Sequence, residues 1–303
     1  MKTIAAASGI ALAAFAHTAT ASCVIVEPVL TPQVLLDPLD ASGAAEFTQP
    51  FALTFRRADT GAGALTVRYQ IVDEDSAIQS RVGAGRGPAV VWQSQDSTRE
   101  IGAFRSDSSP LLRSGVVSLG DDDPAAQTTI FMRLVNLRED LSAGVYREQF
   151  TVRYWCGEDQ AAMPYEAPGA IAVSVAVPNV LSASVAGVSP RGEIDFMDFS
   201  VTRRHLMISV RSTGSYQVSA RSLNNGAMVR EGAAPGLDSA DRIGYEARLE
   251  GEPLMLDGVS TRSMPRAGLA GRQYAFEVEV EDTRSKRAGA YGDTILLTLA
   301  PVN

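Results

Sequence analysis

The chain has 303 residues, 45% of them hydrophobic and 20% charged, with a formal net charge of −8 and a pI near 4.9. This acidic balance argues against binding to nucleic acid or to anionic lipid, because both attract basic surfaces. The length favours two domains, and the hydrophobic content is ample for two cores.

The first 21 residues have the pattern of a secretory signal peptide. Lys2 gives a positive start, residues 4–15 form an apolar run, and residues 19–21 offer small side chains for cleavage before Ser22. No later apolar run reaches the roughly 18 residues that a spanning helix needs. We therefore predict export of a mature chain without a membrane-spanning helix.

Export places the two cysteines, Cys23 and Cys156, in an oxidising compartment. An even count there predicts one disulfide. It would close a loop of about 130 residues, which in the chain-entropy model contributes on the order of 4–5 kcal/mol. The bond would tie the mature N-terminus to the end of a strand in the first domain.

Apolar and polar residues alternate with a period of two throughout the mature chain, and clusters of Gly, Pro, Asp and Ser separate the alternating runs. Each run predicts a strand with one face turned inward. No long stretch keeps a helical period, so the fold class is all-β, built from sandwiches or barrels. The clearest runs are residues 51–55, 65–71, 150–154, 206–211, 216–218, 274–280 and 295–299.

A short pattern, Gly-x-Tyr-x-acid-x-Φ-x-Φ with Φ hydrophobic, occurs at residues 144–152 and again at 289–297. This repeat indicates two domains of similar plan; two unrelated strand starts are the alternative. Residues 171–177 alternate between β-branched and small side chains, and Pro178 ends the run. We place the domain boundary there, giving domains at 22–178 and 179–303.

The sequence carries no convincing constellation of catalytic or metal-binding residues. His205 is the single histidine of the mature chain, and one histidine does not make a usual zinc site or a triad without a nucleophile elbow. Residues 121–123 are three aspartates, typical of a turn, although a calcium site is the alternative. We predict no enzyme activity, no metal and no cofactor.

The second half of the chain resembles the spore coat protein U family, the pilin-like subunits of archaic chaperone–usher pili. The resemblance rests on Ile194-Asp195-Phe196, on residues 206–218, 222–228 and 243–249, and above all on the ending at 289–299 followed by Pro301. It covers residues 180–303 well. The first domain matches weakly, since Glu148 and Phe150 stand where the pattern has Asp and an aliphatic residue.

The resemblance implies an immunoglobulin-like, pilin-like sandwich that lacks its last strand. Such a domain exposes a hydrophobic groove, which a periplasmic chaperone and then an adjacent subunit fill with an added strand, at an outer-membrane usher. The expected groove residues are Tyr291, Ile295, Leu297 and Leu299. An open edge of this kind aggregates unless it is paired.

Cys23 follows the signal peptide almost directly, so we expect no donor strand before the first domain and a position at the tip of an extracellular pilus. Residues 171–177 resemble a donor strand that closes the first domain in cis. Val90, Val91 and Trp92, after a glycine-rich segment, are a candidate adhesive loop for an apolar surface or a neutral glycan; a core strand is the alternative. Rival functions are a secreted coat or matrix protein and a carbohydrate-active β-sandwich enzyme.

Overall fold

The computed structural model describes residues 22–31, 33–39, 46–58, 63–75, 81–83, 87–95, 100–104, 113–137, 141–157, 163–185, 189–233 and 238–302. The proposed signal peptide lies outside them. The described chain forms four β-sheets and one short 3-10 helix, Ser239–Asp241. No helix in these ranges is long and apolar enough to cross a membrane.

Two sheets form a first domain, and their inward faces share one core that includes Leu53, Tyr69, Ile130 and Phe150. One sheet has the order β1-β4-β9-β6: Val24–Val26, Phe47–Arg57, Ala125–Val135 and Ala89–Ser94. The other has the order β2-β11-β10-β5-β7, with β3 beside β11 and β8 beside β5: Val29–Leu30, Tyr165–Val177, Gly144–Cys156, Leu65–Asp73, Gly102–Phe104, Val34–Leu35 and Gly115–Leu119.

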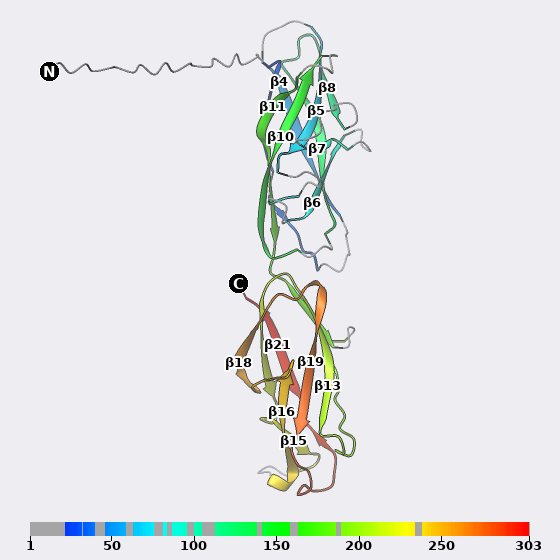
Figure 1. The fold of residues 1–303 in the computed structure, drawn as a ribbon, viewed down its shortest axis with the longest axis vertical. Helices are drawn as coiled ribbons and strands as arrows, with labels where there is room; N and C mark the ends of the chain where they lie inside the picture. Colours follow the sequence, from blue (N-terminus) through cyan, green and yellow to red (C-terminus); the bar gives the residue numbers. More distant parts are fainter. Residues whose placement is uncertain are drawn as a thin grey trace, which may run out of the picture.

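The other two sheets form a second domain at the opposite end of the molecule, around a separate core (Figure 1). The larger has the order β12-β13-β19-β16-β15-β20, with β17 beside β16: Leu181–Val185, Arg203–Ser212, Gly268–Val280, Arg242–Leu249, Ala227–Arg230, Tyr291–Gly292 and Glu252–Pro253. The smaller has the order β18-β14-β21: Asp257–Met264, Tyr216–Ser222 and Ile295–Pro301.

The sequence prediction of two-layer β-structure is confirmed, and every clear alternating run lies in a strand. The alternation also sets the burial: along β14 the side chains of Tyr216, Val218 and Ala220 are buried, and the residues between them are not. A two-layer sandwich produces this pattern because one face of each sheet packs on the other sheet.

Hydrogen bonds pin the short junction between the domains. Only residues 178–180 separate β11 from β12. The hydroxyl of Thr213 donates to the carbonyl of Pro178 (2.7 Å) and accepts from the amide of Val180 (2.9 Å). The Asn179 side chain donates to the carbonyl of Val302 (2.6 Å), so the end of the chain lies beside the junction (Figure 1).

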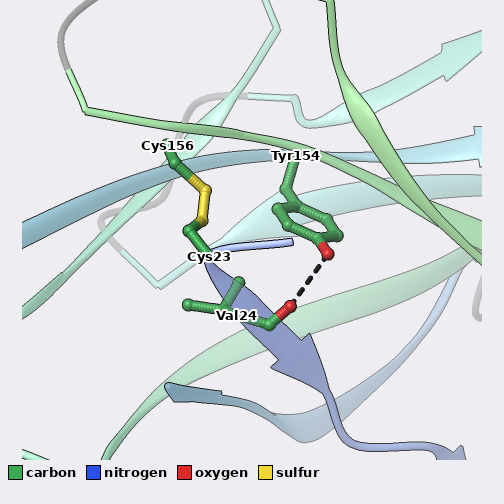
Figure 2. Close-up of a disulfide and its surroundings, with 4 residues drawn as sticks. All are labelled: Cys23, Val24, Tyr154 and Cys156. Atoms are coloured by element: carbon green, nitrogen blue, oxygen red, sulfur yellow. Dashed lines mark hydrogen bonds between the residues drawn. A yellow bond between two sulfur atoms is a disulfide. The ribbon is translucent and has the colours of Figure 1, made fainter. Parts of the chain in front are cut away.

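The predicted disulfide between Cys23 and Cys156 is present, with the two Cα atoms 6.4 Å apart (Figure 2). Next to it, the hydroxyl of Tyr154 donates to the carbonyl of Val24 at 2.9 Å. The bond therefore fastens β1, the first strand of one sheet, to the end of β10 in the other sheet, across a sequence separation of 133 residues.

Replacing both cysteines with Ala should lower the free energy of unfolding of the first domain by about 4 kcal/mol, because a long loop is released in the unfolded chain. Both tryptophans, Trp92 and Trp155, lie in this domain, so their fluorescence during denaturation measures it selectively. Two free thiols in the unreduced protein, by mass spectrometry of periplasmic material, would contradict the bond.

Candidate functional site

β21 is the last described strand of the second domain, and it is paired along one edge only. Its backbone pairs with β14, from Ser222 opposite Ile295 to Tyr216 opposite Pro301. Within the described chain, its other edge has no ladder partner. β20 likewise pairs with β15 alone. A free edge of this kind presents backbone donors and acceptors that can template another strand.

The free edge of β21 borders a groove of about 980 Å³. Its far side is formed by β12, whose only described pairing along that edge is an isolated bridge from Val185 to Ser189. Apolar side chains line the floor, and they come from both sheets: Leu206, Ile208, Met228, Phe276 and Val278 with Ile295, Leu297 and Leu299. The groove therefore opens the core of the second domain between β12 and β21, two strands that do not pair with each other.

The inward-facing side chains of β21 are less buried than those of the neighbouring strand β14. Ile295, Leu297 and Leu299 point to the core, yet each remains only partly buried. The inward residues of the neighbouring β14 are almost completely buried, with Tyr216 and Ala220 each 1% exposed. The two strands differ in their position in this small sheet: β14 lies between β18 and β21, whereas β21 is an edge strand whose inward side chains border the groove.

The first domain contains the same structural corner, at the position that the sequence repeat predicts. Gly144 and Gly289 have φ angles of 153° and 152°. The hydroxyl of Tyr146 donates to the carbonyl four residues earlier, Ser142, at 2.7 Å. The hydroxyl of Tyr291 donates to the carbonyl of Arg287, also four residues earlier, at 2.6 Å. The repeat is thus structural, and β10 corresponds to β20 and β21.

In the first domain, the place beside this corner is filled. β11 runs antiparallel to β10, with Val175 opposite Tyr146 and Ile171 opposite Phe150. Its other edge pairs in parallel with β2 and β3. The alternating side chains of β11 are at most 3% exposed: Ile171, Val173, Val175 and Val177. The sequence expectation that residues 171–177 close the first domain in cis is met by this pairing.

Asp293 fixes the start of β21. Its Oδ2 atom accepts hydrogen bonds from the hydroxyls of Ser222 and Tyr245, both at 2.5 Å, and its Oδ1 accepts from the amides of Thr294 (2.7 Å) and Asn224 (3.2 Å). Burial raises the pKa of Tyr245, and its hydrogen bond to Asp293 raises that pKa further, so the phenol stays a donor. The carboxylate holds one border of the groove to the turn after β14.

A charged cluster anchors Tyr291 at the same end of the groove. Buried Asp241 accepts from Arg230 at 2.6 Å and from Arg287, and the pKa of its carboxyl is lowered by these partners, Arg230 first. The carbonyl of Ala240 lies 3.0 Å from the Tyr291 hydroxyl. The tyrosine ring is therefore fixed at its outer end by the segment that precedes it and by the 3-10 helix.

All four residues expected from the sequence, Tyr291, Ile295, Leu297 and Leu299, line this groove. The sequence did not point to Val185, Leu206 or the aromatic side chains of residues 196–199, which line it too. Their signal was weak because Val185 and Leu206 look like ordinary inward strand residues. They line a groove because β12 and β21 do not pair with each other.

The candidate adhesive loop is corrected by the structure. Val90 and Trp92 lie on β6 and are 4% and 1% exposed, while Val91 is partly buried. The Trp92 ring packs edge-on against Phe150, with centroids 5.2 Å apart. The triplet is the core strand of the alternative interpretation, because its alternation places two of three side chains inside.

The other polar candidates have structural surroundings. Asp123 accepts from the amide of Gly120 at 2.8 Å, which is turn chemistry. His205 is exposed on β13, opposite Glu277. Of the glycine-rich segment 83–87, residues 84–86 lie outside the described chain. Among the described residues, no group of three or more His, Cys, Asp or Glu is placed to hold a metal ion.

Comparison with known proteins gives structural resemblances at low identity. One chain in the chaperone–tip adhesion subunit pre-assembly complex of the archaic Csu pili of Acinetobacter baumannii is 14% identical to this chain. The match covers 91% of this chain and 99% of that chain, with a TM-score of 0.44. The CupB6 tip adhesin of Pseudomonas aeruginosa is 14% identical, with 91% and 92% covered and a TM-score of 0.43.

A third resemblance is to CfaE, the adhesive subunit of CFA/I fimbria of enterotoxigenic Escherichia coli. It is 9% identical, with 91% of this chain and 92% of that chain covered, at a TM-score of 0.45. No protein-family model and no curated protein matches the sequence. Membership of the spore coat protein U family therefore stays a hypothesis.

We predict that Asp293→Asn lowers the free energy of unfolding of the second domain by about 1–3 kcal/mol, because the Ser222 and Tyr245 hydroxyls lose a charged acceptor. Amide hydrogen exchange in β14 and β16 measures this domain directly. Asp282→Asn is the control, since that exposed carboxylate bonds only locally to Arg284. Equal effects of the two substitutions would contradict the anchoring role.

Proposed function

We propose that this protein is the tip subunit of a chaperone–usher pilus, joined to the fibre by a strand that another protein inserts into the groove of its second domain. The observation that carries the proposal is the contrast between the two domains. In both domains a tyrosine hydroxyl, of Tyr146 or of Tyr291, donates to the carbonyl four residues earlier. In the first domain β11 pairs beside this tyrosine, whereas in the second domain a groove of about 980 Å³ lies beside it.

The first domain supplies a template for the inserted strand. Because the repeat has a constant offset of 145 residues, Tyr146 corresponds to Tyr291 and Phe150 to Ile295. Transferring the pairing of β11 places an aliphatic residue opposite each of them, antiparallel to β21. The predicted donor is therefore an extended segment with alternating aliphatic side chains, which binds by strand addition.

The energetics favour occupation of the groove. Completing the burial of the three partly buried side chains of β21 would contribute on the order of 2–5 kcal/mol, before the ordering cost of the donor. The backbone groups on the free edges of β12 and β21 would also gain partners. In the export pathway, a periplasmic chaperone would supply the strand first, an usher would mediate exchange, and the adjacent subunit would replace it.

The self-completed first domain is the part of the chain that this assembly leaves free for contact with a surface or a glycan. Its β11 already occupies the position that a neighbouring subunit would otherwise fill. The chain would then present one acceptor groove to the fibre and a closed domain to the target. This arrangement suits a terminal adhesive subunit better than an enzyme or a matrix protein.

The test is co-expression of the full chain with a periplasmic pilus chaperone. We expect a one-to-one complex, and a marked loss of complex with Leu297→Asp, since a charge then lies on the groove wall. Thr298→Asp is the matched control: Thr298 follows Leu297 on β21, but it is exposed on the opposite face and does not line the groove.

A soluble, monomeric protein that ignores the chaperone and melts cooperatively in both domains would overturn the strand-acceptor function. Equal loss of the complex with Thr298→Asp and Leu297→Asp would also count against the groove. Hydrolytic activity that depends on acidic side chains would favour the enzyme instead.

A further inference from the structure

The end of the groove near Tyr291 is shaped by an aromatic loop between β12 and β13. Phe199 lies edge-on to Tyr291, with ring centroids 6.3 Å apart, and is stacked on Phe196 at 6.0 Å. All three side chains line the groove. Phe196 is 4% exposed and belongs to the core, so the stack is held from below.

The loop holds Phe199 in an unfavourable backbone conformation. Phe199 has a φ of 59° and Met197 a φ of 51°, in the left-handed region that non-glycine residues rarely adopt. This conformation is strained for a residue other than glycine, so surrounding contacts must maintain it. Those contacts are Asp195 Oδ1 with the amide of Met197 (2.7 Å), Asp198 Oδ1 with the amide of Ser200 (3.0 Å), and the amide of Phe199 with the carbonyl of Phe196 (2.9 Å).

Tyr291 cannot easily move away from this ring. Its hydroxyl is bonded to the carbonyl of Arg287, and its backbone pairs with Arg230 on β15. Two aromatic side chains, one fastened by its hydroxyl and the other by its loop, therefore limit the space at this end of the groove.

The corresponding corner of the first domain is built differently. The ring of Tyr146 packs against the backbone of Gly83 and Gly87, where an added Cβ would come within 2.9 Å and 3.0 Å of it. The residue opposite Tyr146 on the inserted strand is Val175, which is 0% exposed. Two glycines thus lie against the tyrosine ring of the first domain, whereas the aromatic side chain of Phe199 lies against the corresponding ring of the second.

We propose that Phe199 is a specificity-determining residue, which restricts the donor side chain opposite Tyr291 to a small one, such as Gly or Ala. The inference rests on the proposed strand-acceptor function and adds the size limit at one position. Opposite Ile295, a β-branched residue equivalent to Ile171 remains the expected occupant.

The experiment uses the full chain and fluorescent peptides that copy residues 165–177, with Gly, Ala, Val or Phe in place of Val175. Wild-type protein should bind the Ala peptide at least about 10-fold more tightly than the Val or Phe peptides, by fluorescence anisotropy. Phe199→Ala should remove or reverse this preference, and Phe199→Leu, which keeps an apolar side chain, should give an intermediate one.

Met197→Ala is the matched control, because Met197 lies in the same loop with a similar φ but is 73% exposed. It should keep the wild-type preference. The same size preference in wild type and Phe199→Ala, or a preference for Val over Ala in wild type, would overturn the proposal.

Strand acceptance and the size limit can be distinguished in this experiment. If none of the peptides binds wild type or Phe199→Leu, strand acceptance itself is contradicted, and the size limit falls with it. If all four peptides bind wild type equally, strand acceptance stands and the role of Phe199 is wrong.

Discussion

The constraint on which this structure depends is that an edge strand with an apolar inward face must be covered on that face and paired along its backbone. Water can satisfy the exposed backbone groups, but it cannot cover the apolar row without a loss of free energy. β10 meets the constraint through β11, and its inward residue Phe150 is 0% exposed. β21 meets it only on the side of β14, which leaves Leu297 partly buried in the groove.

The two domains therefore differ in how the corresponding edge is covered. In the first, the covering strand follows β10 directly along the sequence, so closure is intramolecular and independent of concentration. In the second, the proposed function has another molecule supply the covering strand, so stability would depend on that molecule's affinity and concentration. The hydrogen bonds of the Asp293 carboxylate and of the Tyr291 hydroxyl hold this border of the groove in position.

Much of this architecture could be predicted from the sequence, because period-two alternation reports directly on which face of a strand is buried. The disulfide is predicted by the count of two cysteines in an exported chain, the two-domain plan by the repeat, and the proposed groove residues by the family resemblance. The sequence leaves Val90 to Trp92 open between an adhesive loop and a core strand, because a glycine-rich approach fits either; packing on Phe150 places Trp92 inside. The Phe199 loop escaped prediction because left-handed Met197 and Phe199 follow no periodic pattern.

The junction gives the molecule a defined route for mechanical tension. A force that pulls the two domains apart would act on the end of β11 and the start of β12, which only residues 178–180 separate. Asn179 also joins Val302, directly after β21, so both strands that border the groove are attached at the same point. The 13-residue β11 would be loaded along its length, in shear, with its ladder hydrogen bonds sharing the force. Resistance of this kind is set by the rate of unfolding under load, and it can be high in a protein of ordinary equilibrium stability.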